Sequence, residues 1–134
     1  MSKKSKVIQT RGKRKTSVAR ASLKPGKGKI TINGQYLENF SNEMSRLRIL
    51  EPLLLAGDVA KKVNISVNVF GGGVNGQADA SRLAIARSLV KYDESLKQSF
   101  VEYDRLLLVA DIRRKEACKP NDSKARAKRQ KSYR

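Results

Sequence analysis

Histidine and tryptophan are absent from this chain of 134 residues, and cysteine occurs once, at Cys118. Without histidine, neither a Ser-His-Asp nor a Cys-His arrangement is available for nucleophilic catalysis. The same shortage excludes a Cys/His zinc site and a disulfide framework, which indicates a reducing, intracellular setting. Cys118 lies in a polar, basic run, where we interpret it as an incidental thiol rather than a nucleophile. We therefore expect no enzymatic activity, no metal and no cofactor.

Long apolar runs are also missing. The first residues lack the apolar core of a secretory signal, and no segment approaches the roughly 20 apolar residues that a membrane-spanning helix needs. We expect a cytoplasmic protein with no membrane partner.

Acidic residues are scarce, since 12 Asp and Glu stand against 30 Lys and Arg and leave a net charge of +18. The excess lies at the two ends: residues 1–29 carry +11, residues 30–110 are neutral and residues 111–134 carry +7. A neutral, globular middle between cationic ends is the electrostatic pattern of a protein that binds a polyanion. The length fits a single domain.

Alternating apolar and polar residues predict an antiparallel sheet near the start of the chain, with strands at residues 7–10, 18–23 and 30–32. Arg20 falls on the solvent-facing side of its strand. Residues 11–15, with the sequence RGKRK, are predicted to form a basic loop, and Asn33-Gly34 is a tight-turn signal. The loops of this sheet therefore carry Lys and Arg.

Helical spacing dominates the next part of the chain. Ser41 is expected to cap a helix whose buried face holds Met44, Leu47 and Leu50. Pro52 is expected to end or kink this helix.

A second group of elements is expected near residue 100. Asp93 is a candidate cap for a helix that buries Phe100 and Tyr103. Residues 106–110 are predicted to form a short buried strand, which residues 112–117 continue along a sheet edge.

Residues 63–70 alternate like a strand with one buried face, and a helical pattern begins at Ala78. Four glycines lie between them: Gly71, Gly72, Gly73 and Gly76. A strand that leads through a glycine turn into a helix is a common phosphate-binding unit. Mononucleotides, dinucleotides and polynucleotides are all possible ligands of such a unit.

Two of these ligands fit the sequence poorly. Gly76 is followed by Gln77-Ala78, where a nucleotide-binding P-loop needs Lys and Ser/Thr. The spacing G-x-G-x-x-G is met, but the acidic residue that holds a ribose is missing at the end of the next strand. A polynucleotide remains, with the loop amides and the basic ends near its phosphates. RNA is favoured over duplex DNA, because no recognition helix is evident and long basic tails commonly order on RNA.

Arg82 has two open interpretations. It lies within the apolar arc of the predicted helix, three residues after Asp79. In the first, it pairs with Asp79 and extends along the sheet edge to water. In the second, it reaches over the glycine loop to a phosphate.

The composition divides the chain into three parts. Residues 1–6 form a basic leader, residues 7–118 a globular RNA-binding domain, and residues 119–134 a basic tail. The tail has too little apolar content to fold alone, and it spans up to about 50 Å when extended.

Five blocks of sequence closely resemble the universal S-nine family, the ninth protein of the small ribosomal subunit. In chain order they are VIQTRGKRKTSVARASL, GKGKITING, FGGGVNGQADASRLAIARSLV, YDRLLLVADIRR and ARAKRQKSYR. The blocks follow the order of the family across nearly the whole chain. The ending QKSYR is similar to the archaeal and eukaryotic branch, and Ile112 stands where many members have proline.

The resemblance implies a structural component of the head of the small ribosomal subunit, with ribosomal RNA (rRNA) and neighbouring head proteins as partners and no small-molecule substrate. It also implies the fold, which is α+β. A four-stranded mixed sheet is packed by helices on one face and contains a left-handed strand–helix–strand crossover. The second domain of the ribosomal protein S-five is similar.

Candidate rRNA contacts come from the basic segments and the glycine loop: Arg11, Lys13, Arg14, Lys15, Arg20, Lys27, Lys29, Gly72, Gly73, Gln77, Arg82, Arg87, Arg113, Arg114, Lys124, Arg126, Lys128 and Arg129. The resemblance further implies that the tail approaches the anticodon stem-loop of the P-site tRNA. There Arg134 meets a tRNA phosphate, with Lys131, Ser132 and Tyr133 beside it.

Two other hypotheses remain open from the residues alone. An architectural DNA- or RNA-binding protein outside the ribosome is expected to bind duplex DNA and rRNA equally at one salt concentration. A small nucleotide-dependent enzyme is expected to bind a nucleotide saturably without RNA.

Overall fold

The computed structural model describes residues 6–121, 124–128 and 130–133. Its centre is a mixed sheet of five strands in the order β1-β2-β5-β3-β4, with only β3 and β5 parallel. The strands are β1 (Ile8–Arg14), β2 (Ser17–Pro25), β3 (Ile30–Ile32), β4 (Gln35–Tyr36) and β5 (Val63–Phe70).

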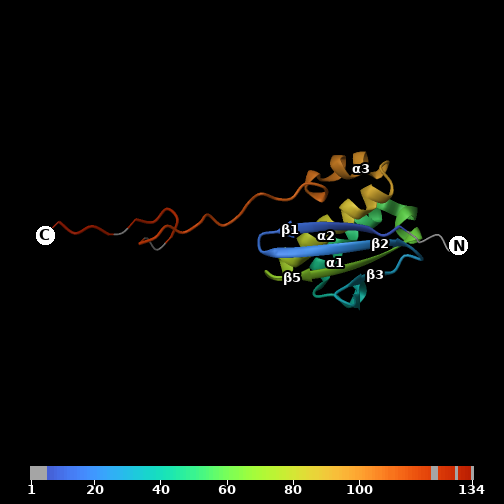
Figure 1. Cartoon of the computed structure of the whole chain (residues 1–134), viewed down its shortest axis with the longest axis horizontal. Helices are drawn as coiled ribbons and strands as arrows, with labels where there is room; N and C mark the ends of the chain where they lie inside the picture. Colours follow the sequence, from blue (N-terminus) through green and yellow to red (C-terminus); the bar gives the residue numbers. More distant parts are fainter. Residues whose placement is uncertain (1–5, 122–123, 129, 134) are drawn as a thin grey trace.

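Among the described residues, three α-helices accompany the sheet, with short 3-10 turns between the elements. The α-helices are α1 (Glu43–Ala56), α2 (Val74–Tyr92) and α3 (Leu96–Tyr103), and the 3-10 turns are η1 (Leu37–Asn39), η2 (Gly57–Lys62) and η3 (Arg105–Leu107). Figure 1 shows α1 and α2 behind the sheet formed by β1, β2 and β5. The expected α+β class with a mixed sheet is therefore confirmed.

The sheet has five strands where four were expected. The additional strand, β4, holds only two residues and follows the Asn33-Gly34 turn. The β3–α1–β5 connection joins two parallel neighbours, as the family resemblance implies. The left-handedness of this connection stays a prediction.

One face of the sheet forms the core. Alternate residues of β2 and β5 are buried there, led by Leu23, Ile65 and Val67, and α2 covers them with Ile85 and Leu89. Burying each such side chain stabilises the fold by about 1.5–3 kcal/mol. The period of two that predicts these strands reflects this single buried face.

The basic loop predicted at residues 11–15 is wrong. These residues continue β1 as far as Arg14, and only Lys15 and Thr16 form the turn into β2. Arg11 and Lys13 point outward from this edge strand into water, whereas Arg14 points to the helix side and pairs with the Asp79 and Asp111 carboxylates. These charges therefore do not prevent pairing.

The buried face expected for α1 is wrong at two of its three residues, since only Leu50 is half-buried and packs against the core. Met44 and Leu47 are exposed, whereas Ile49 and Leu53 are buried with the interior Pro52. The capping residue is Asn42 rather than Ser41, because the side-chain Oδ1 of Asn42 accepts a hydrogen bond of 2.9 Å from the Ser45 N–H.

The C-terminal elements differ in part from expectation. Residues 106–110 form the turn η3 and irregular chain instead of a strand, because the Asp104 carboxylate caps the Leu106 N–H at 2.9 Å. Phe100 of α3 is buried as expected, but Tyr103 is exposed.

No helix or strand occurs after η3 in the part of the chain that is described. Figure 1 shows this segment leaving the domain and extending away from it. The predicted sheet edge at residues 112–117 is therefore wrong.

Candidate nucleic-acid interface

The second face of the sheet is not covered by α1 or α2. We call its outward side chains the open face, which consists of Gln9, Arg11, Lys13, Val18, Arg20, Ser22, Lys24, Thr31, Asn64, Ser66, Asn68 and Phe70. The strand register aligns these side chains in rows across the sheet. Arg11 lies opposite Arg20, which lies opposite Asn68, and Phe70 is opposite Val18 in the next row.

The open face carries cations without anions. None of the five strands contains Asp or Glu, whereas the open face holds four Arg and Lys side chains. Arg11 and Arg20 face each other directly across two strands. Like charges in such a pair destabilise a sheet, so a nearby polyanion relieves a repulsion that the fold itself does not neutralise.

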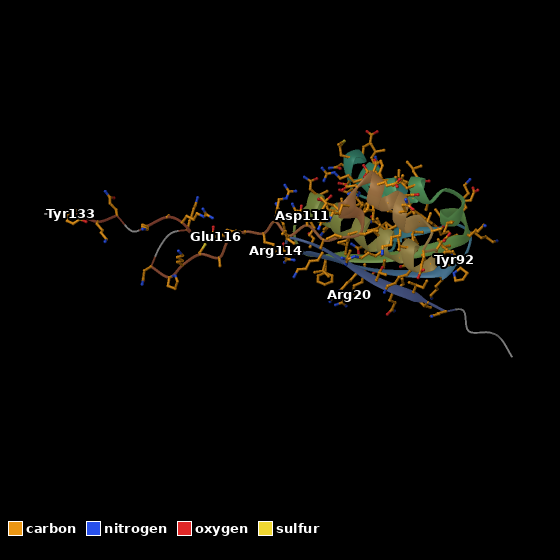
Figure 2. The ribbon with its side chains drawn as sticks, turned by 90° about the horizontal axis from the view of Figure 1, so that it is seen from above. Arg20, Tyr92, Asp111, Arg114, Glu116 and Tyr133 are labelled. Carbon is orange, nitrogen blue, oxygen red and sulfur yellow. The ribbon has the colours of Figure 1, made fainter. Side chains whose placement is uncertain are left out.

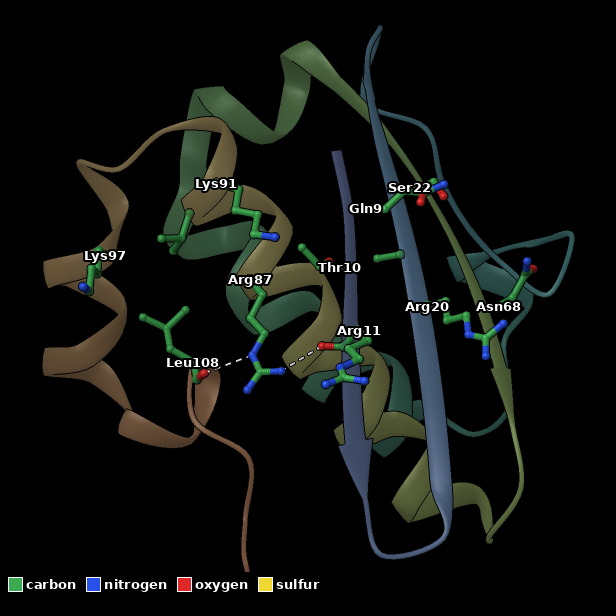
Figure 3. A pocket seen from close by; sticks show the side chains of 12 residues that line it. Gln9, Thr10, Arg11, Arg20, Ser22, Asn68, Arg87, Lys91, Lys97 and Leu108 are labelled. Carbon is green, nitrogen blue, oxygen red and sulfur yellow. Dashed lines mark hydrogen bonds between the residues drawn. The ribbon is translucent and has the colours of Figure 1, made fainter. Parts of the chain in front are cut away.

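A hollow of about 870 Å³ runs around the edge strand β1. On the open face it is lined by Arg11, Arg20 and Asn68, and on the other side by residues of α2 and α3 (Figure 3). The second side adds Arg87, Lys91 and Lys97, so this hollow has five cations and no carboxylate in its lining.

Arg87 holds the two sides of this hollow together. Its Nε donates to the Leu108 carbonyl at 3.1 Å, and its Nη1 donates to the Arg11 carbonyl at 2.9 Å (Figure 3). Burial lowers the pKa of Arg87 from its usual value, and the charge of Arg11 lowers the pKa further. Arg87 therefore positions β1 against η3 in addition to contributing charge.

A second hollow, of about 560 Å³, lies on the open face near the other end of the strands. Its lining includes Gln9, Ser22, Lys24, Lys29 and Asn64, again without a carboxylate. The two hollows share Gln9 and Ser22, so they form one continuous polar and basic surface.

The carboxylates gather instead on the helix side. Arg82 of α2 contacts the Glu51 carboxylate of α1 and, at 3.1 Å, the Asp104 carboxylate that follows α3. Asp79 pairs with Arg48 at 3.2 Å and with Arg14 at 3.9 Å. The expected pair between Arg82 and Asp79 is therefore wrong, because Arg82 pairs with Glu51 and Asp104 instead. The Arg82 side chain is 13% exposed and joins three helical elements, which favours the internal interpretation of this residue.

A separate group fixes the point where the chain leaves the domain. We call Arg14, Asp111 and Arg113 the exit cluster. Arg14 lies 3.5 Å from the Asp111 carboxylate and donates to the Arg113 carbonyl at 3.0 Å, and Arg113 binds Asp111 at 2.7 Å. Hydrogen bonds from Arg113 hold the pKa of Asp111 far below its usual range, and the charges of Arg113 and Arg14 lower it further. Figure 2 shows Asp111 at the start of the extended segment, followed by Arg114, Glu116 and Tyr133.

The glycine loop packs against the β1–β2 turn. A side chain at Gly72 would overlap the Ser17 hydroxyl, and one at Gly71 would lie 2.6 Å from the Thr16 carbonyl oxygen. The Gln77 amide donates to the Gly71 carbonyl at 3.1 Å. Gly73, in contrast, has nothing within 4 Å of the position of a side chain. Packing explains the first two glycines without a ligand.

The remaining predicted contacts are spread over turns and the extended segment. Lys15, Lys27, Arg114, Lys124 and Lys128 are exposed on turns or in the segment, and Arg126 pairs with Glu116 at 2.9 Å. Lys131, Ser132 and Tyr133 are exposed. Arg129 and Arg134 lie outside the described residues.

The sequence predictions missed four residues of the cationic surface: Lys24, Phe70, Lys91 and Lys97. The signal for Lys24 and Phe70 is present, because the alternation of β2 and β5 places both on the open face. Lys91 and Lys97 had no such signal, because the turn between α2 and α3 brings them to β1.

In the residues described, no group of three or more His, Cys, Asp or Glu side chains is positioned to hold a metal ion. Within the same residues, every helix is too short or too polar to cross a membrane. Cys118 is an exposed, free thiol.

Comparison with known proteins gives consistent matches. A family model described as ribosomal protein S9/S16 matches residues 12–134. The small ribosomal subunit protein uS9 of Thermoplasma volcanium is 57% identical over 129 residues, which are 95% of this chain and 98% of that protein. The proteins of the same name from Pyrobaculum aerophilum and Methanothrix thermoacetophila are 52% and 47% identical, each over 96% of this chain and over 92% and 99% of the relative.

Proposed function

The chain belongs to the ribosomal protein S9/S16 family of structural, non-enzymatic proteins of the small ribosomal subunit, and from this premise we propose how it binds RNA. The globular domain binds rRNA in the head of the subunit through the cations of its sheet and turns, beside neighbouring head proteins. The C-terminal tail reaches the P-site tRNA. The ribosome places the protein in the cytoplasm.

One observation carries the rRNA part of the proposal. The strands expose basic side chains and contain no acidic residue, whereas paired carboxylates gather on the helix side. Phosphate contacts fix a protein on RNA, and Arg and Lys supply them. The candidate contacts that lie on the open face, Arg11, Lys13 and Arg20, fit this role best. Arg14, Arg82 and Arg113 already have internal partners and take secondary roles.

The division of the chain follows the exit cluster. We propose residues 1–6 as a leader, residues 7–118 as the RNA-binding domain and residues 119–134 as a tail. The described residues after Leu107 contain no helix or strand, so the extended chain begins before Lys119, at the exit cluster.

The tail proposal assigns tRNA contact to Lys131, Ser132, Tyr133 and Arg134. Its support is the exposure of the first three and the planar guanidinium of the last, which suits phosphate oxygens. A tail that extends from a fixed point reaches a ligand that the domain itself does not touch.

Deletion of residues 131–134 tests this role. We expect the variant to co-sediment with the small subunit while its affinity for P-site tRNA falls, because two cations and an aromatic ring are removed from the tip. The double variant Lys61→Gln, Lys62→Gln is the control, since it removes two cations from exposed positions of η2. Unchanged tRNA affinity after the deletion contradicts the tail proposal.

A further inference from the structure

We propose that the open face binds an unpaired stretch of RNA and stacks at least one base on the pair formed by Phe70 and Arg20. The inference rests on the proposed function, and it specifies the surface and the form of RNA that the domain recognises.

The exposed aromatic ring of Phe70 is the first feature that supports stacking. Its side chain is 52% exposed at the end of β5, on a surface that is otherwise polar and basic. The other outward residues of this strand are Asn64, Ser66 and Asn68. A large aromatic ring left in water contributes little to the core, but it offers a flat face to a base.

The position of the Arg20 guanidinium beside the Phe70 ring is the second feature that supports stacking. Its guanidinium carbon lies 5.8 Å from the centre of the Phe70 ring, within the range of a cation–π contact. Figure 2 shows Arg20 on the side of the sheet away from the helices. Both planar groups are ones on which unpaired bases stack, and the guanidinium also donates to phosphate.

The row beside this pair supplies the contacts to the backbone. Arg11 lies opposite Arg20, and Lys13 lies two residues further along β1, opposite Val18 in the row of Phe70. The spacing between neighbouring strands is about 5 Å, so these cations follow a phosphate chain laid across the edge of the sheet. Asn68, Ser22 and Gln9 provide donors and acceptors for base edges and 2′-hydroxyl groups.

Charge complementarity decides the class of partner. The open face lacks any carboxylate that would bind a basic protein, and the exposed aromatic ring of Phe70 lies next to the cation Arg20. The uncompensated repulsion between Arg11 and Arg20 is removed by a polyanion. A flat sheet, rather than a protruding helix, favours splayed single-stranded bases over the grooves of a duplex.

The first experiment measures affinity of the full-length chain for a single-stranded RNA of about twelve nucleotides, a length typical for one binding surface. We expect Phe70→Leu to lose at least about 5-fold in affinity, the lower end of the effect of removing one base–aromatic stack, and Phe70→Tyr to retain it. Tyr103→Leu, at an exposed aromatic of α3, is the control and leaves the affinity unchanged. Equal losses for Phe70→Leu and Tyr103→Leu, or an equal loss for fully paired RNA, overturn the proposal.

The substitution Arg11→Thr is expected to change stability and RNA affinity in opposite directions. The change removes one member of the like-charged pair and introduces a residue that favours strands. We expect the melting temperature of the free protein to rise while the affinity for single-stranded RNA falls. A rise in melting temperature with unchanged affinity overturns the proposed role of this row.

A photo-crosslinking amino acid at position 70, compared with position 103, tests the surface in the assembled subunit. We expect crosslinks to rRNA from position 70 and none from position 103. If the chain co-sediments with the small subunit but position 70 crosslinks to another protein, or forms no crosslink to RNA, the stacking inference is overturned. The proposed function is not affected by that result. Failure of the unmodified chain to co-sediment overturns the proposed function itself.

Discussion

At Gly12, strand β1 touches helix α2 with no room for a side chain. A Cβ atom there would overlap the Ala80 carbonyl oxygen and lie 2.8 Å from the Ala84 nitrogen, both of which are backbone atoms. Gly12 therefore sets the distance between the edge strand and the helix behind it. Thr10, the next inward residue of β1, also contacts α2, but it does so through its hydroxyl, which donates to the Ala84 carbonyl at 2.8 Å.

Substitution of Gly12 tests this contact. We expect Gly12→Ala to lower the free energy of unfolding by about 1–3 kcal/mol, since backbone on both sides has to shift. Gly73→Ala is the matched control, because nothing lies within 4 Å of its added carbon, and its cost stays below about 1 kcal/mol. Denaturant unfolding of the two variants measures the difference, and equal midpoints contradict the close approach.

Single residues also show where sequence patterns stop being informative. The apolar arc of the helix identifies Arg82 as unusual, and a pair with Asp79 that extends to water is one of its two expected roles. The pattern does not identify Glu51 and Asp104 as the partners, since α1 and the end of α3 approach Arg82 only through the tertiary fold.

Among the elements, the strands follow their sequence signals more closely than α1 does. One face of β2 and β5 is buried and the other faces solvent, so apolar residues recur at every second position of these strands. Helix α1 has Leu on more than one side, and its apolar positions do not select a single face. Packing against α2 makes the selection, which buries Ile49 and leaves Leu54 exposed.

The apolar run at residues 106–110 fails as a strand for a similar reason. Five apolar residues suit a buried strand or a helical turn equally, and the period of two is not testable over so short a run. The hydrogen bond from the Leu106 N–H to the Asp104 carboxylate stabilises the turn η3 instead.

For the candidate site, the alternation of the strands locates the open face. The hollow around β1 could not be predicted, because it depends on how α2 and α3 are placed.

The contact between α1, α2 and α3 through Arg82 gives a prediction at this scale. Arg82→Gln leaves two carboxylates without their shared cation, and we expect a loss of about 1–3 kcal/mol in the free energy of unfolding. Arg105→Gln, at an exposed position of η3, is the control, with a change within about 0.5 kcal/mol. A variant Arg82→Gln that keeps its stability but loses RNA affinity favours the phosphate role of Arg82 over the internal one.

For the molecule as a whole, the absence of histidine determines how stability depends on pH. Hydrogen bonds from Ser95 and Arg113 lower the pKa values of Asp93 and Asp111, respectively, in the folded state. Groups with a lowered pKa stabilise the fold above the unfolded value of about 3.9, and this contribution is lost as the pH falls through the folded pKa. No side chain with an ordinary pKa near 6.5 is present.

We therefore expect a constant free energy of unfolding between about pH 5 and pH 7, followed by a decline below about pH 4. Asp111→Asn makes the decline shallower, because one of the groups with a lowered pKa is gone. Denaturant unfolding across this range measures both effects. A step in stability near pH 6 contradicts the assignment of the acid response to carboxylates alone.

The separation of charge between the two sides of the sheet has a consequence for how the protein meets its partner. Uncompensated cations on the strands, with carboxylates behind them among the helices, give the domain an electric dipole whose positive pole is the open face. In the field of a nucleic acid, such a dipole experiences a torque before any contact forms. The domain therefore rotates as it approaches, and a larger share of its collisions begins with the strands leading. Salt shortens the distance over which this rotation acts to about 10 Å at 0.1 M, so that orientation is then found by random tumbling.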